Sequence, residues 1–277
     1  MRRVTTHALR ACAAATALLA LATGCSSEED HKNPSAAKKD AKKDAGKAAA
    51  EAVRTAVAKV RGTSADIHGT VLVADGEGAF PLFLDGPFDL AEDKGKLAVD
   101  FPGGAIDHVD EIFDGDTIYV HGIHSVAKGT WGAAVRDKAE AHYLLRAPLN
   151  DPEHYLRQIS AMREVERLAI NETVAGTLAT RYRGSIDHAT LTLRLADKPR
   201  KSAEKMRDVQ GADLPVSADA WVDHQGRLVQ LKMTYRMATV SVTTTMTLSA
   251  FGKPVEVTAP DASRTVPVTS KGGVLLG

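Results

Sequence analysis

The strongest constraint on the fold of this chain is the alternation of apolar and polar residues in two neighbouring segments near the C-terminus. Residues 229–237 carry an apolar side chain at every odd position, from Val229 to Met237. Residues 240–248 repeat the alternation at even positions, with Thr244 as the one polar member of that series. Side chains two residues apart share one face of a strand. The sequence therefore predicts two strands of a sheet with one apolar face, which must curl over packed side chains or over a bound lipid.

Further β-rich segments follow one another with short turns between them. Residues 75–78 (Asp-Gly-Glu-Gly) and 114–116 (Asp-Gly-Asp) are typical hairpin turns. Such turns make strands that are neighbours in sequence antiparallel neighbours in the sheet. The expected strands are 65–73, 80–90, 96–101, 108–113, 117–120, 165–170, 178–186, 191–195, 218–223, 228–236 and 240–251.

Helical spacing occurs in three places. Residues 49–60 carry one apolar stripe, which predicts a helix from about residue 47 to Arg61. Residues 134–162 show helical spacing divided by Pro148, with a good helix start at residues 151–153 (Asp-Pro-Glu). A polar insert at 199–210 is the third helical candidate. We therefore predict an α+β fold, in which helices lie on one face of an antiparallel sheet.

The N-terminus has the pattern of an export signal. Arg2, Arg3 and Arg10 accompany an apolar run at residues 11–22, and small residues lead to Cys25. The run is too short to span a bilayer as a retained helix. The pattern resembles the lipobox of bacterial lipoproteins. That resemblance implies that Cys25 carries acyl chains such as palmitate and holds the protein on the extracytoplasmic face of the cell membrane. The alternative is a plain secretory signal.

Composition predicts four parts of the chain. These are a signal peptide (1–24), a lipidated cysteine with a flexible tether (25–46), a folded domain (47–262) and a C-terminal tail (263–277). Residues 26–46 have no aromatic or β-branched side chain, so we expect them to stay unfolded. Their lysines could attract anionic headgroups, although the interleaved aspartates favour a solvated spacer.

Composition also argues against several kinds of chemistry. The only cysteines are Cys12 and Cys25, which leaves the folded domain without thiol chemistry. The 35 basic and 35 acidic residues give no electrostatic reason to expect a nucleic-acid partner. Acidic residues and histidines gather at residues 107–124, but His121 and His124 are three apart and would point to opposite faces of a strand. We therefore expect no metal, no cofactor and no enzymatic activity.

Four segments resemble the mycobacterial LppX/LprAFG lipoprotein family. Residues 221–228 (WVDHQGRL) are similar to its W-x-D-x-x-G-R-L hairpin, and residues 251–260 (FGKPVEVTAP) to its closing segment. Residues 174–184 and 129–131 are similar to its middle strand and its K-W step. The resemblance implies a strongly curved antiparallel β half-barrel, similar to the lipoprotein carrier LolA, with helices covering the concave face over a hydrophobic cavity. Residues 198–211 match nothing in the family, which leaves the choice of ligand open.

The resulting prediction is a monomeric, membrane-anchored lipoprotein. The resemblance implies that it binds acylated lipids or glycolipids for lipid transport or trafficking in the cell envelope, and a membrane transporter could be its partner. The alternative is an envelope interaction module or sensor with a filled core. The residues expected to line a cavity are Val71, Val73, Leu82, Leu84, Leu97, Val99, Ile118, Val120, Leu156, Ile159, Leu191, Leu193, Leu231, Met233, Tyr235, Met246 and Leu248.

Overall fold

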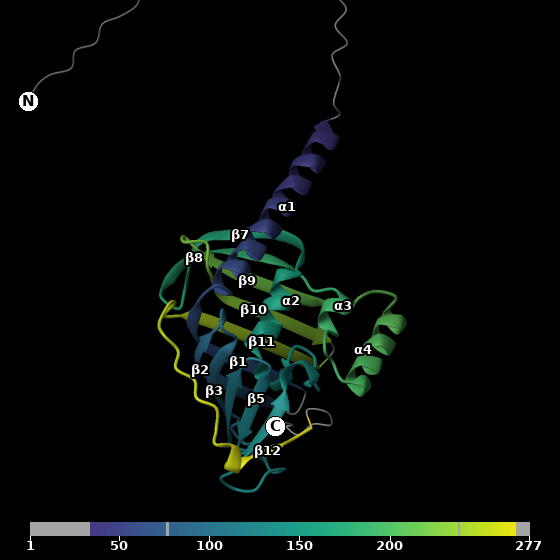
Figure 1. Cartoon of the computed structure of the whole chain (residues 1–277). Coiled ribbons are helices and arrows are strands. Elements are labelled where there is room, and N and C mark those ends of the chain that lie inside the picture. Colours follow the sequence, from purple (N-terminus) through teal and green to yellow (C-terminus); the bar gives the residue numbers. More distant parts are fainter. Residues whose placement is uncertain (1–33, 76–77, 238, 270–277) are drawn as a thin grey trace, which may run out of the picture.

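The computed structural model describes residues 34–75, 78–237 and 239–269 (Figure 1). The predicted signal peptide and Cys25 lie outside these residues. Twelve strands form one open sheet in the order β12-β6-β5-β4-β3-β2-β1-β11-β10-β9-β8-β7. Neighbouring strands are antiparallel, except that β12 runs parallel to β6. This is the mostly antiparallel sheet that the sequence predicts, whereas its curvature into a half-barrel with helices on the concave face stays a prediction.

The strands are β1 (Ser64–Ala74), β2 (Ala79–Asp89), β3 (Lys94–Asp100), β4 (His108–Asp114), β5 (Thr117–His121), β6 (Trp131–Val135), β7 (Arg163–Val174), β8 (Thr177–Ser185), β9 (Val216–Asp223), β10 (Leu228–Met237), β11 (Val240–Ser249) and β12 (Thr265–Pro267). The α-helices are α1 (Pro34–Val60), α2 (Pro152–Ser160), α3 (His188–Leu191) and α4 (Asp197–Gln210). Short 3₁₀ turns occupy Arg136–Lys138, Pro148–Asn150 and Ala262–Arg264.

The alternation near the C-terminus produces the central strand pair. Leu231 lies opposite Met246 and Tyr235 opposite Val242 in the register of β10 and β11. All four side chains are buried, while Lys232 and Arg236 on the other face of β10 are exposed. The predicted apolar face is therefore confirmed, and it forms part of one continuous hydrophobic core.

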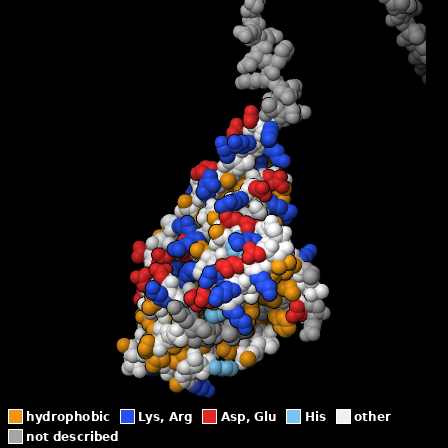
Figure 2. Space-filling view, turned by 90° about the vertical axis from the view of Figure 1, so that its right-hand side faces the viewer, with side chains coloured by type: hydrophobic (Ala, Val, Ile, Leu, Met, Phe, Trp, Pro, Cys, Tyr) orange, Lys and Arg blue, Asp and Glu red, His pale blue; other side chains and the backbone are white. Residues whose placement is uncertain are grey.

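Helices α1 and α2 pack against the same part of the sheet. α1 contacts α2 and strands β7, β9 and β10, and α2 contacts β9. The predicted stripe of α1 is confirmed, because Val53, Val57 and Val60 are all buried in the core. Figure 1 shows the N-terminal half of α1 projecting from the body. On the face in Figure 2, charged side chains cluster toward α1 and hydrophobic ones gather toward the opposite end.

The predicted flexible tether is wrong for residues 34–46, which form the first half of α1. Ala and Lys dominate this stretch, and both have high intrinsic helix propensity. The side chains of residues 39–46 are not buried, so this half of α1 is a solvated helix that continues a packed one. The sheet also extends past the predicted boundary at residue 262, because residues 265–267 form β12.

Two further expectations are corrected. Residues 134–147 contain no α-helix: Ala134 belongs to β6, opposite Ile118 of β5, and only one short 3₁₀ turn follows. Residues 191–195 are not a strand. Asp187 instead caps the short helix α3 by accepting a hydrogen bond from the amide of Thr190. In both places the apolar pattern is too short to distinguish the helical period from the strand period. Contacts with the rest of the fold therefore decide the local structure.

The two edges of the sheet differ from its centre. β12 has only three residues. β7 is long, but its pairing with β8 shifts register at three places, and Glu164 and Asn171 have positive φ angles of 52° and 58°. In the described part of the chain, no helix combines the length and apolarity needed to cross a bilayer.

Candidate ligand pocket

A pocket of about 250 Å³ opens beside β1 and β2. Its wall is apolar apart from Tyr143 and Arg146. The lining residues are Val71, Val73, Phe80, Pro81, Leu82, Phe101, Pro102, Gly103, Gly104, Tyr143 and Arg146.

Strand register sets one wall of the pocket. Val71 lies opposite Leu82, and Val73 lies opposite Phe80, in the antiparallel pair of β1 and β2. Opposed side chains stand on the same face of a sheet, so that these four form a continuous apolar strip. Phe80 is 59% exposed, which places its ring at the solvent end of that strip.

The segment 143–147 closes the pocket from the other side. The hydroxyl of Tyr155, on α2, accepts a hydrogen bond from the amide of Ala147 at 3.0 Å. The hydroxyl of Thr244, on β11, donates to the carbonyl of Leu145. Leu145 has a positive φ of 59°. The segment has no regular secondary structure of its own, so these contacts with α2 and the sheet hold it in place.

Arg146 brings a cation into this apolar surrounding. Its guanidinium carbon lies 5.5 Å from the centre of the Phe101 ring, within the range of a cation–π interaction. Burial lowers the pKa of Arg146, while interactions with Tyr155, Glu111 and Tyr143 oppose that shift. Arginine stays charged in proteins even so, and a cation with reduced hydration therefore lines the pocket.

Glu111 is a buried acid that interacts with Arg146. It is 1% exposed, and its Oε1 accepts a hydrogen bond from Nδ2 of Asn150 at 2.9 Å. Its Oε2 has no hydrogen-bond partner among the described residues. Burial raises the pKa of Glu111 to about 8, although Asn150 and Arg146 act in the opposite direction. At pH 7 this carboxyl is therefore mostly protonated and uncharged.

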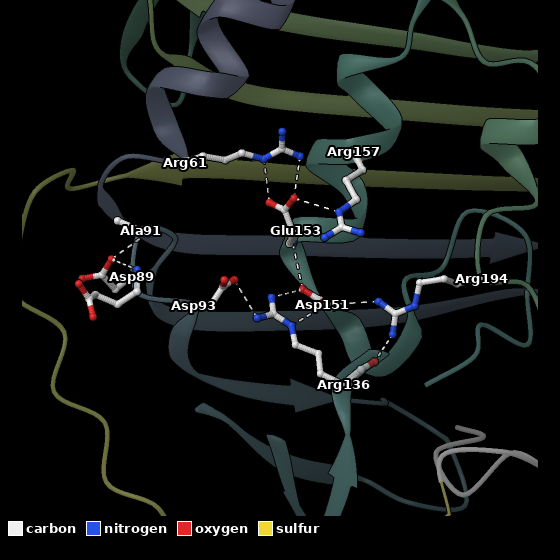
Figure 3. Close-up of polar contacts among 10 residues, drawn as sticks. Arg61, Asp89, Ala91, Asp93, Arg136, Asp151, Glu153, Arg157 and Arg194 are labelled. Carbon is white, nitrogen blue, oxygen red and sulfur yellow. Dashed lines mark hydrogen bonds and ion pairs between the residues drawn. The ribbon is translucent and has the colours of Figure 1, made fainter. Parts of the chain in front are cut away.

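An ion-pair network fixes α2 and its approach segment (Figure 3). Asp151 caps α2 by accepting from the amide of Glu153 at 3.1 Å. It also accepts two hydrogen bonds from Arg136, at 2.8 and 2.9 Å. Arg136 reaches Asp93 at 2.8 Å, and Glu153 pairs with Arg61 of the segment that follows α1. The predicted helix start at residues 151–153 is thus confirmed, with buried ion pairs that the sequence did not indicate.

The structure brings only part of the predicted cavity set into this pocket. Val71, Val73 and Leu82 line it. Leu193 is 36% exposed and lies after α3. The others are buried in the hydrophobic core and do not line the pocket: Leu84, Leu97, Val99, Ile118, Val120, Leu156, Ile159, Leu191, Leu231, Met233, Tyr235, Met246 and Leu248.

Sequence reasoning missed the non-strand side of the pocket. Phe101, Tyr143 and Arg146 lie outside regular strands and helices, so no periodicity marks them. The signal available for Phe80 was alternation, since it shares the parity of Leu82 and Leu84. Residues 101–104 and 143–146 are far apart in the sequence and meet only in the folded structure. No local pattern could therefore predict that they line the same pocket.

Two of the four family-like segments, residues 221–228 and 251–260, lie away from the pocket. Asp223 accepts hydrogen bonds from the amides of Gln225 and Arg227, both at 2.9 Å, and from Nε of Arg227 at 2.8 Å. The guanidinium of Arg227 lies 4.4 Å from the centre of the Phe251 ring. Phe251 packs against a small second core that contains Trp221. The W-x-D-x-x-G-R-L hairpin and the closing segment therefore stabilise one corner of the sheet.

Among the histidines and acids of residues 107–124, His108 and His121 pair with Asp110, and His108 also pairs with Asp100. His108 lies between Asp100 and Asp110, with Nδ1 2.6 Å from Asp100 and Nε2 3.1 Å from Asp110. The hydrogen bond with Asp100 raises the pKa of His108, against a smaller opposing effect of burial. Across the described ranges, no group of three or more histidine, cysteine or acidic residues is placed to hold a metal ion.

No family model matches this chain, and no curated protein matches it. Among solved structures it is similar to lipoprotein LppX of Mycobacterium tuberculosis, with 15% identity, 76% of this chain and 99% of that chain covered, and a TM-score of 0.44. It is also similar to a LolA superfamily protein of Nitrosomonas europaea, with 10% identity, 79% and 97% covered, and a TM-score of 0.31. The MucA/MucB complex of Pseudomonas aeruginosa matches with 10% identity, 78% and 59% covered, and a TM-score of 0.35. The LppX and LolA types of fold that the sequence predicts are thus among the structures that this chain resembles.

Proposed function

We propose that this chain is a lipid-binding protein of the bacterial cell envelope, held on the extracytoplasmic face of the cell membrane by acyl chains on Cys25. It takes up the hydrocarbon part of acylated lipids or glycolipids and carries them within the envelope, without catalysing a reaction. The observation that carries this proposal is the apolar pocket beside β1 and β2. Apolar walls with few polar groups are typical of sites that bind hydrophobic ligands.

The size of the pocket limits what enters it in this conformation. A water molecule occupies about 30 Å³ of liquid and a methylene group is of similar size, so the 250 Å³ pocket holds roughly eight such groups. Burial of each methylene contributes about 0.8 kcal/mol, or ~6 kcal/mol for eight, before the cost of immobilising the ligand. We propose that lipids with several long chains need α1 and α2 to move away from a concave sheet face.

Lipid analysis of the purified protein tests the proposal. We would express the full chain with Cys25→Ser, purify it without detergent and extract it for lipid mass spectrometry. We expect acylated species to co-purify at near one molecule per chain, because the apolar pocket retains hydrocarbon that water excludes. A stable, well-folded and lipid-free protein that also takes up no added phospholipid would overturn the proposal.

A second candidate function is a docking module with a filled core. It is favoured by the burial of most predicted cavity residues within the core. Leu72 and Phe83 lie on the other face of the sheet from Val71, and they are 37% and 44% exposed. Exposed apolar side chains of this kind are typical of a contact surface for a partner. In that case the lipid-free protein should capture one specific envelope protein, and Phe83→Ser should abolish the capture.

A further inference from the structure

Five residues both line the pocket beside β1 and β2 and are exposed to solvent, and they are called the pocket rim below. They are Phe80, Pro102, Gly103, Gly104 and Tyr143. Phe80 is 59% exposed and Tyr143 is 44% exposed. The five include no aspartate, glutamate, lysine, arginine or histidine. An apolar and partly aromatic surface therefore borders the mouth of the pocket.

The backbone holds the rim in this exposed position. The amide of Gly104 donates a hydrogen bond to the carbonyl of Phe101 at 2.9 Å, and the amide of Phe101 donates to the carbonyl of Asp107 at 2.9 Å. The Phe101 side chain is buried in the core and so anchors this loop. On the other side of the mouth, Phe80 lies in β2 opposite Val73 of β1. The exposed apolar groups thus stand on a fixed frame.

The position of the rim favours a lipid surface as its partner. Large exposed apolar groups that cluster together are typical of an interaction site, and tyrosine is enriched where a membrane meets water. The rim also borders the opening through which a hydrocarbon chain would enter the pocket. If that chain crosses water first, each exposed methylene lowers its population roughly fourfold. Contact between the rim and a lipid surface removes this penalty.

We propose that the pocket rim docks on the surface of a lipid bilayer. The Phe80 ring enters the apolar layer, and Tyr143 lies at the level of the headgroups. This inference rests on the proposed lipid-binding function and identifies the surface with which the pocket exchanges its ligand. Because the rim has no charged residue, docking requires no anionic lipid and persists at high salt.

Exposed apolar residues at another edge of the sheet provide the contrast. Ile170 on β7 is 64% exposed and Leu178 on β8 is 55% exposed. Strands β9, β10, β11 and β1 separate β7 and β8 from β2 in the sheet, and neither residue lines the pocket. Exposure alone would predict lipid contact at both places. The proposal predicts it at the rim, where the pocket opens.

Vesicle flotation tests the docking. We would use residues 25–277 with Cys25→Ser, which keep the whole described fold and lack both the acyl chains and the apolar run at residues 11–22. We expect this protein to float with vesicles of phosphatidylcholine alone, equally at about 0.1 M and about 1 M NaCl. The protein needs no further substitution for this measurement.

Tryptophan reporters locate the contact. In Phe80→Trp, phosphatidylcholine with brominated chains should quench the emission more than it quenches the parent protein, which contains two tryptophans. Ile170→Trp is the matched control and should show no additional quenching. Phe80→Ser should lower the fraction bound to vesicles about fivefold or more, because the buried ring is lost. Ile170→Ser should leave it unchanged.

The outcomes separate the docking from the pocket. Decanol dissolves as single molecules, so its calorimetric titration reports the pocket without a lipid surface. Decanol binding without flotation would refute the docking and leave the pocket standing, and absence of both would refute the two together. Flotation without decanol binding would support the docking and refute the pocket.

The variants also distinguish the partner. Flotation that is lost in Ile170→Ser and kept in Phe80→Ser would assign the contact to β7 and refute the rim. Flotation that requires anionic lipid or low salt would refute an uncharged contact. Absence of flotation, together with capture of one envelope protein that Phe80→Ser abolishes, would give the rim a protein partner and refute the lipid surface.

Discussion

At the scale of single residues, Glu111 and His154 are buried ionisable groups that folding keeps uncharged. Burial raises the pKa of Glu111 from 4.5 to about 8 and lowers the pKa of His154 from 6.5 to about 4. The native state binds the proton of Glu111 more tightly than the unfolded chain does, so its contribution to stability is lost as the pH rises from 4.5 to 8. For His154 the unfolded chain binds the proton more tightly, and stability is lost as the pH falls from 6.5 to 4.

Glu111→Gln should therefore stabilise the protein at neutral and alkaline pH. The amide keeps an oxygen to accept the hydrogen bond from Asn150 and has no proton to lose. We expect the gain in the free energy of unfolding to be near zero at pH 4.5 and to reach at most about 3 kcal/mol at pH 7. Urea unfolding at several pH values measures this. Glu92→Gln, at an exposed turn, is the control, and a Glu111→Gln gain that does not grow with pH would contradict the assignment.

At the scale of elements, α2 depends on one residue at its start. Asp151 is 2% exposed, caps the helix and accepts two hydrogen bonds from Arg136. Asp151→Ala leaves a buried guanidinium without this partner, and we expect a loss of roughly 3–5 kcal/mol in the free energy of unfolding. Asp197→Ala at the start of α4 removes an exposed pair with Arg200 and should cost under about 1 kcal/mol. Chemical unfolding measures both losses. Similar losses in the free energy of unfolding would refute the idea that burial makes the Asp151 pair more important than the exposed Asp197 pair.

The sequence predicts elements well where a period repeats many times. The paired β10 and β11 and the packed half of α1 follow from alternation and from a helical stripe. It fails at residues 134–147 and 191–195, where only a few apolar residues carry the pattern and contacts with the rest of the fold decide the local structure. The same distinction holds for the residues that line the pocket. Val71, Val73 and Leu82 belong to long strands and were predicted, whereas Arg146 belongs to a segment held only by tertiary contacts.

At the scale of the whole molecule, the pocket and the filled core should respond differently to added volume. Val71→Trp places an indole beside open space, so we expect it to lower lipid occupancy severalfold while the fold persists. Val99 is fully buried, does not line the pocket and should not tolerate the same change, with a loss of about 1–3 kcal/mol or more. Native mass spectrometry and thermal unfolding separate the two effects.

An exposed site provides the control for these substitutions. Leu178→Trp, on β8, adds the same side chain at a position that is 55% exposed. It should change neither lipid occupancy nor stability. Unchanged occupancy in Val71→Trp would mean that hydrocarbon binds somewhere other than the strip on β1 and β2.

The irregular edges of the sheet affect how separate copies of the chain can associate. A straight outer strand offers unpaired backbone groups to which a second molecule can add its own strand, and the addition can continue into a fibre. Leu168 and Ile170 on β7 are exposed and would favour such growth. The positive φ angles of Glu164 and Asn171 and the repeated register shifts bend β7 away from the geometry it requires. For a protein proposed to be crowded in two dimensions on a membrane, we expect this distorted border to hinder neighbouring copies from adding strands to one another.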